Sequence, residues 1–101
     1  MSTLEDARQR AAATYNSAHD FYDHPANTFW GRYGRRTIER LRLPQRTNVL
    51  DVCCGSGASA LPAAEAVGLS GSVTAVDLAE NLLALARTKA SERGLTNIQF
   101  E

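Results

Sequence analysis

The chain has 101 residues, enough for one small domain or part of a larger one, and its 44% hydrophobic and 22% charged residues are typical of a globular protein rather than a disordered one. Eleven basic and eleven acidic residues give no net charge, so no overall field attracts nucleic acid or an anionic membrane, and we expect no nucleic-acid partner. No apolar run approaches the roughly 20 residues of a membrane span, and the first residues lack the pattern of a secretory signal.

The first helix is expected from residue 4 to about residue 22. Thr3 can serve as its N-cap, and Glu5 and Asp6 lie in the first turn, where the helix dipole favours acidic side chains. The sequence H-P-A-N at 24–27 should end this helix, because the residue before a proline is pushed out of the helical region.

A second helix is expected over residues 28–42, with one face marked by helical spacing. That face consists of Trp30, Tyr33, Gly34, Thr37, Ile38 and Leu41. We expect Trp30 and Tyr33 to lie in the core rather than to form a platform for substrate. Six arginines lie in or just after this helix: Arg32, Arg35, Arg36, Arg40, Arg42 and Arg46. They are either a solvated helix face or a site for an acidic substrate or partner, and the sequence leaves both open.

From residue 47 onward the pattern changes to alternating strands and helices. Short β-rich runs at 47–52, 72–77 and 97–101 are separated by helix-length segments at 58–67 and 79–93. The first of these helices is rich in alanine, and the second ends at Gly94, a residue that suits a helix C-terminus. This order predicts parallel βαβ units with right-handed crossovers, and therefore an α/β fold.

The junction between the first strand and the next helix carries a glycine motif. Gly55-x-Gly57-x-x-Ala60 follows the strand directly, and the second strand ends in Asp77. In nucleotide-binding βαβ units, such glycines let backbone N–H groups approach a ligand, and an acid at the end of the second strand accepts hydrogen bonds from ribose hydroxyls. The motif therefore predicts a nucleotide site between this loop and Asp77.

Asp51 distinguishes between classes of nucleotide. A carboxylate four residues before Gly55 would repel the pyrophosphate that dinucleotide enzymes hold at this point, so a dehydrogenase is disfavoured. A cofactor with a cationic amino-acid end suits the loop better. Here the run Asp51-x-Cys53-x-Gly55-x-Gly57, followed by V-D-L-A-E-N-L-L, resembles the class I S-adenosylmethionine-dependent methyltransferases. The chain departs from the family at Cys53, where glycine is more common.

The two adjacent cysteines have no C-x-x-C or Cys/His spacing that would hold zinc, and neighbouring cysteines rarely bridge to each other. We expect no metal site and a reducing, cytoplasmic location. Cys53 and Cys54 are interpreted as small packing residues of the loop, with a reactive Cys54 thiolate as the alternative.

The resemblance implies the cofactor S-adenosyl-L-methionine and assigns roles to single residues. Gly55 and Gly57 would lie against its methionine part, Asp77 would hold the ribose hydroxyls and Leu78 would flank the adenine. The segment T-Y-N-S-A-H-D-F-Y-D is similar to the lid of ubiquinone/menaquinone-type small-molecule methyltransferases, in which Tyr15 would close over the site; a helix–helix contact is the alternative for this tyrosine. The full set of expected cofactor-binding residues is Asp51, Cys53, Cys54, Gly55, Ser56, Gly57, Asp77, Leu78 and Tyr15.

By the same resemblance, the chain holds the first three strands of a seven-strand Rossmann-like parallel sheet with helices on both faces, preceded by two N-terminal helices. We expect residues 1–46 to be a helical lid segment and residues 47–101 to be the first, truncated half of the cofactor domain. The expected function is methyl transfer to a small-molecule acceptor, with no catalytic residue assigned; His19 and His24 have no identifiable partner. The alternative is a non-catalytic nucleotide-binding or assembly module. A homodimer, or pairing with a C-terminal half, is expected to form through the exposed edge at 47–52.

Overall fold

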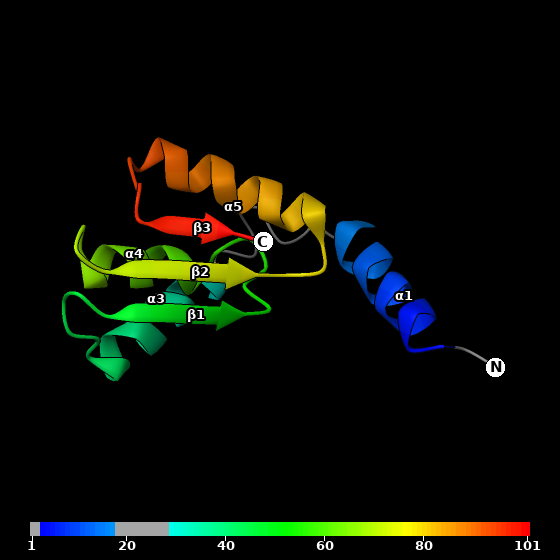
Figure 1. Cartoon of the computed structure of the whole chain (residues 1–101), viewed down its shortest axis with the longest axis horizontal. Helices are drawn as coiled ribbons and strands as arrows, with labels where there is room; N and C mark the ends of the chain where they lie inside the picture. The colour runs from blue at the N-terminus through cyan, green and yellow to red at the C-terminus, as the bar shows by residue number, and fades with distance from the viewer. Residues whose placement is uncertain (1–2, 18–28) are drawn as a thin grey trace.

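The computed structural model describes residues 3–17 and 29–101 (Figure 1). Its helices and strands, in chain order, are α1 (Leu4–Ser17), α3 (Phe29–Leu41), β1 (Asn48–Val52), α4 (Ala60–Val67), β2 (Ser72–Val76), α5 (Glu80–Glu92) and β3 (Ile98–Phe100). Each lies where the sequence predicts a helix or strand, and the α/β fold is confirmed. The predicted end of the first helix near residue 22, and the H-P-A-N segment, lie outside the described residues.

The three strands form one parallel sheet in the order β1-β2-β3. Val49 of β1 is paired with Val73 of β2, which is in turn paired with Ile98 of β3. These three side chains lie on the face that packs against alanines of α4 and Leu83 of α5. The connection from β1 to β2 runs through α4, and the connection from β2 to β3 runs through α5. Both move in the same direction across the sheet, so right-handed connections place α4 and α5 on the same face.

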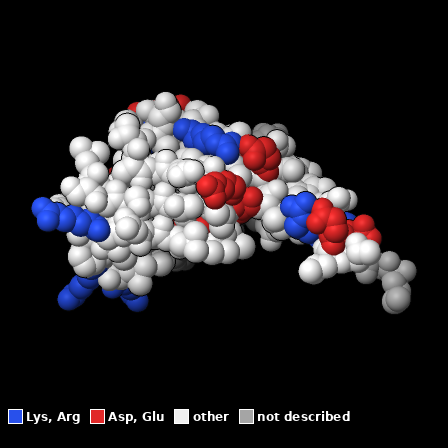
Figure 2. Space-filling model, in the orientation of Figure 1, with Lys and Arg blue, Asp and Glu red and all other residues white. Residues whose placement is uncertain are grey.

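The opposite face of the sheet is bare in the described part of the chain. Leu50 and Val52 of β1 point to this face and are 65% and 63% exposed. It faces the viewer in Figure 1, where β1 and β2 are drawn in front of α4 and α3, and Figure 2 shows that its centre carries no charged side chain. The second edge of β1 has no strand paired to it among the described residues, since β1 is the outer strand of the sheet.

Helix α3 packs against α4 and the segment just before it. Ile38 is buried in the shared core, and a Cβ atom placed on Gly34 would lie 2.1 Å from the carbonyl oxygen of Ala58. The prediction of a buried position for Trp30 and Tyr33 is wrong, because these side chains are 43% and 68% exposed. Two crossing helices touch over a short length, so only the middle of the predicted face of α3 is covered.

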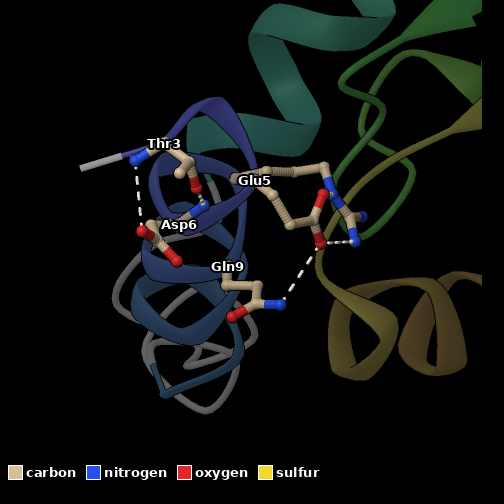
Figure 3. A network of polar contacts seen from close by, with 5 residues as sticks. Thr3, Glu5, Asp6 and Gln9 are labelled. Carbon is tan, nitrogen blue, oxygen red and sulfur yellow. Dashed lines mark hydrogen bonds and ion pairs between the residues drawn. The ribbon is translucent and has the colours of Figure 1, made fainter. Parts of the chain in front are cut away.

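Helix α1 has no buried residue, and it extends from the start of α5 away from the sheet (Figure 1). The predicted N-cap is confirmed: the Asp6 N–H donates to Thr3 Oγ1 over 3.0 Å, and the Thr3 N–H donates to Asp6 Oδ2 over 3.1 Å (Figure 3). The hydrogen bond from the Thr3 backbone N–H, and after it the Thr3 side chain, lowers the pKa of the Asp6 carboxyl. Arg8 donates to Glu5 over 2.6 Å one turn further on. The first half of α1 is thus held by its own side chains.

Two further sequence interpretations can be compared with the fold. Gly94 follows α5 with a φ of +67°, the left-handed conformation that suits a helix C-terminus, as expected. The arginines in and after α3 are all exposed, and Arg35 lies 4.0 Å from Glu65 of α4.

No helix in the described ranges has both the length and the apolar composition needed to cross a membrane.

Candidate functional site

A pocket lies at the carboxyl ends of β1 and β2, at the edge of the sheet where α/β proteins bind ligands. Its volume is about 330 Å³, within the range of small-molecule sites. It is lined by Ala11, Tyr15, Trp30, Cys53, Cys54, Gly55, Ser56, Ala58, Ser59, Asp77, Leu78 and Leu82. The site therefore combines residues from both N-terminal helices with residues of the sheet half.

The loop after β1 turns through three left-handed residues. Gly55 and Gly57 have φ angles of +57° and +95°, and Cys53 has a φ of +61°. Glycine adopts this conformation without steric cost, whereas a side chain at Cβ makes it less favourable by about 1–2 kcal/mol. The loop is thus built for glycine at all three positions, and Cys53 occupies one of them under strain.

Asp77 joins this loop to the end of β2. Its carboxylate accepts a hydrogen bond from the Gly55 N–H over 2.9 Å through Oδ2, and one from the Ala79 N–H over 2.8 Å through Oδ1. A carboxylate oxygen can accept more than one hydrogen bond, so both oxygens retain lone pairs for a ligand. Asp77 therefore fixes the loop and the start of α5 around the pocket that it also lines.

Asp51 lies beside the pocket rather than among its lining residues. The Ser59 hydroxyl donates to Asp51 Oδ2 over 2.7 Å, so β1 is tied to the residue that precedes α4. Gly57 also lies behind the lining, where a Cβ atom would approach the Leu61 side chain to 3.0 Å. The other predicted cofactor residues, listed with the pocket above, are brought together in its wall.

The two adjacent cysteines differ in environment. Cys53 is exposed, and Cys54 is 5% exposed and packed in the core. Burial, together with the charges of Asp51 and Asp77, raises the pKa of the Cys54 thiol to about 12. The alternative of a reactive Cys54 thiolate is therefore wrong, because the thiol stays protonated at neutral pH.

Tyr15 and Trp30 form the outer wall of the pocket. Tyr15 comes from the end of α1 and Trp30 from the first turn of α3, and both are partly exposed at 47% and 43%. Phe29 lies against Trp30 with ring centroids 4.7 Å apart. Aromatic side chains and the Asp77 carboxylate in the same pocket suit a ligand that has both a flat ring and hydroxyl groups.

The charge of the lining narrows the class of ligand. Among the described residues that line the pocket, Asp77 is the one charged residue and none is basic, and the Asp51 carboxylate lies beside it. A pyrophosphate would meet negative charge from these residues and no described cationic side chain, whereas a ligand with a positive centre and a sugar diol fits. Among residues 3–17 and 29–101, no three His, Cys, Asp or Glu side chains are grouped closely enough to bind a metal ion. His19 and His24 fall outside these ranges.

Residues 49–101 match a family of proteins described as the methyltransferase domain. The chain belongs to this family. The resemblance to class I S-adenosylmethionine-dependent methyltransferases that the glycine motif predicts is thereby confirmed.

Individual methyltransferases resemble the chain over most of its length. It is 35% identical to aklanonic acid methyltransferase DauC of Streptomyces sp. (strain C5), over 92% of the chain and 42% of that protein. It is 38% identical to a demethylmenaquinone methyltransferase of Listeria monocytogenes, over 68% of the chain and 29% of that protein. A crystal structure of a SAM-dependent methyltransferase from Aquifex aeolicus has 26% identity and a TM-score of 0.66, over 83% of the chain and 44% of that structure. The chain thus spans less than half the length of these methyltransferases.

Three features of this pocket and its surroundings could not be found from the sequence. The sequence predicts Trp30 in the core because it lies on the same periodic face of the helix as Ile38. Helical periodicity, however, does not show at which residue a helix stops contacting its neighbour. Ser59 had no signal beyond its position after the glycine loop. Asn16 contacts Asn81 across 65 positions of sequence, a distance over which no local pattern operates.

Proposed function

We propose that this chain is the cofactor-binding part of an S-adenosylmethionine-dependent methyltransferase that acts on a small molecule. The observation that carries the proposal is the arrangement around Asp77, whose carboxylate lies at the end of β2, bonded to the glycine loop and open to the pocket. In this position, the carboxylate can accept hydrogen bonds from the two ribose hydroxyls.

The remaining walls suit the other parts of this cofactor. Leu78 and Leu82 offer apolar surface for the adenine, next to the acid that holds the ribose. Cys53, Gly55 and Ser56 line the side nearer to β1, where the methionine part would lie with the Asp51 carboxylate close by. Negative charge beside the loop favours the cationic amino group and sulfonium centre of the cofactor.

When bound, S-adenosylmethionine supplies a methyl group on a sulfonium sulfur, which a nucleophile of the acceptor takes by in-line displacement. The part of the chain described here would bind and orient the cofactor. Tyr15 and Trp30 would limit access of water from the side of the two N-terminal helices. Much of the rate enhancement in such a reaction can come from holding the two reactants in line. We assign no catalytic base.

The acceptor is proposed to be a small molecule because the relatives named above include methyltransferases whose names give aklanonic acid and demethylmenaquinone. We propose the cytoplasm as location, since both cysteines are free thiols. A homodimer or a C-terminal half is the proposed partner of the edge at 47–52. The sheet face beside this edge, which the described part of the chain leaves uncovered and which exposes Leu50 and Val52, supports such pairing.

Calorimetric titration of the intact protein with S-adenosylhomocysteine, with NAD as the control, tests the proposal. We expect S-adenosylhomocysteine to bind and NAD not to bind. Tighter binding of NAD would refute the methyltransferase reading. Binding of S-adenosylhomocysteine with no methyl transfer to any acceptor would instead favour the alternative, a non-catalytic module that retains the fold.

A further inference from the structure

The last turn of α1 is attached to the first turn of α5 by a pair of hydrogen bonds. The backbone N–H of Asn81 donates to Asn16 Oδ1 over 2.9 Å, and Asn81 Nδ2 donates to the Asn16 carbonyl oxygen over 3.4 Å. The two helices lie side by side at this point in Figure 1, and α1 contacts α5. This attachment joins residues that are 65 positions apart in the chain.

The contact supplies what the start of α5 lacks. The first backbone N–H groups of a helix have no partner within the helix, and a side chain at the N-cap usually accepts one of them. In α5 the N-cap residue is Ala79, which has no side-chain acceptor, and Asn81 is the second residue of the helix. Asn16 therefore acts as an N-cap delivered from another helix.

The contact also lies at the rim of the pocket. Ala11 and Tyr15 are one helical turn apart on α1 and both line the pocket, as does Leu82 of α5, the neighbour of Asn81. Asn16 follows Tyr15 directly, so its hydrogen bond to Asn81 holds the lining residues of α1 next to the lining residue of α5.

Other contacts at the far end of α1 do not fix its position against the sheet half. The reciprocal hydrogen bonds of Thr3 and Asp6 and the ion pair of Arg8 with Glu5 all join residues of the same segment (Figure 3). They stabilise the first turns of the helix wherever it lies.

We propose that Asn16 is a positioning residue, which docks α1 on the start of α5 and thereby holds Ala11 and Tyr15 over the cofactor pocket. The proposal rests on the proposed function, because it takes the pocket to be the S-adenosylmethionine site. Specifically, the position of Ala11 and Tyr15 would depend on the side-chain oxygen of Asn16, a residue that does not itself line the pocket.

The test compares Asn16→Ala with Asn16→Asp in the intact protein. Alanine removes the acceptor, whereas aspartate keeps an oxygen in place and adds a negative charge that a helix N-terminus favours. Thr14→Ala is the matched control, because Thr14 lies on the same helix and its hydroxyl bonds only to the Arg10 carbonyl oxygen within α1. A second control is Asn81→Ala, which keeps the backbone N–H of the shorter hydrogen bond.

Two readouts separate docking from cofactor binding. Hydrogen exchange of residues 4–17 without ligand reports docking, and we expect it to become about three- to tenfold faster in Asn16→Ala, the range for loss of one neutral hydrogen bond. Dissociation of S-adenosylhomocysteine should become faster by a similar factor. Asn16→Asp, Thr14→Ala and Asn81→Ala should stay close to the wild type in both.

The possible results are distinguishable. Failure of the wild-type protein to bind S-adenosylhomocysteine would count against the proposed function. Binding by the wild type, with unchanged exchange and dissociation in Asn16→Ala, would overturn the role of Asn16. Equal losses in Asn16→Asp and Asn16→Ala would also overturn it, because the acceptor oxygen would then not be the cause.

Discussion

Two glycines of α3 provide a matched pair of substitutions. Gly34 and Gly31 lie on the same helix, one turn apart. A Cβ atom on Gly31 would meet no atom of the described residues within 4 Å, whereas one on Gly34 would lie 2.1 Å from the Ala58 carbonyl oxygen and 2.9 Å from the backbone nitrogen of Ser59. Alanine is favoured over glycine in a helix by up to about 1 kcal/mol, so both substitutions should gain the same helix propensity. They differ in the atoms that the new methyl group would contact.

The size of the effect follows from the contact distance. Non-bonded heavy atoms are comfortable at about 3.5 Å, so α3 must move away from Ala58 by more than about 1 Å to accept the methyl group. The atoms in the way are backbone, which no rotamer change can clear. Overpacking of this kind costs typically about 1–3 kcal/mol, and the shift would also loosen the buried Ile38 one turn further along.

We therefore expect Gly34→Ala to lower the free energy of unfolding by about 1–3 kcal/mol and Gly31→Ala to leave it unchanged or raise it by up to about 1 kcal/mol. Urea unfolding of the intact variants measures both. Because Ala58 and Ser59 line the pocket, affinity for S-adenosylhomocysteine should fall in Gly34→Ala alone. Equal stability of the two variants would show that α3 does not make this close contact.

Three further predictions concern the loop and the strand ends. Asp77→Ala should weaken S-adenosylhomocysteine binding about tenfold to a hundredfold in calorimetry. It should also lower the melting temperature of the protein without ligand, because the backbone N–H groups of Gly55 and Ala79 lose their acceptor. An unchanged affinity would show that Asp77 does not bind the ribose. Cys54 has a pKa raised to about 12 from 9.0, so its stabilising effect is present below pH 9 and is lost as pH rises toward 12. The free energy of unfolding from urea titration should be lower at pH 10 than at pH 8, by an amount on the order of 1 kcal/mol that Cys54→Ala lacks. An equal loss in both proteins would contradict the raised pKa. Cys53→Gly should raise the melting temperature, since relief of a left-handed φ is worth about 1–2 kcal/mol and the greater flexibility of glycine in the unfolded chain offsets about 0.5–1 kcal/mol of it. A lower melting temperature would argue against strain at this residue.

The fold could be predicted from the sequence because its signals are local. Runs of β-branched residues alternate with alanine- and leucine-rich helices at a spacing that only a parallel sheet allows, and caps such as Thr3 and Gly94 mark helix ends through residues close in sequence. The glycine loop and Asp77 could be placed at one edge for the same reason, since the ends of parallel strands meet there.

What the sequence did not reveal depends on contacts between helices. The period of α3 predicts one continuous buried face, yet Ile38 is the one buried residue of α3, Gly34 lies against Ala58 just before α4, and Trp30 lines the pocket. The bare face of the sheet was likewise missed, because the two crossovers could be placed on one face only once the strand order β1-β2-β3 was known.

The start of α5 shows why one local rule fails at this site. Ala79 is a poor N-cap, and a capping side chain there would normally contribute about 1 kcal/mol. Instead, Asp77 accepts the Ala79 N–H and Asn16 accepts the Asn81 N–H, so the end of β2 and the helix α1 supply the missing acceptors. The first turn of α5 is therefore fully capped only when the end of β2 and the helix α1 are in place. Local sequence and global fold disagree here, as is common at functional sites, and the disagreement links the capping of α5 to residues beside the pocket.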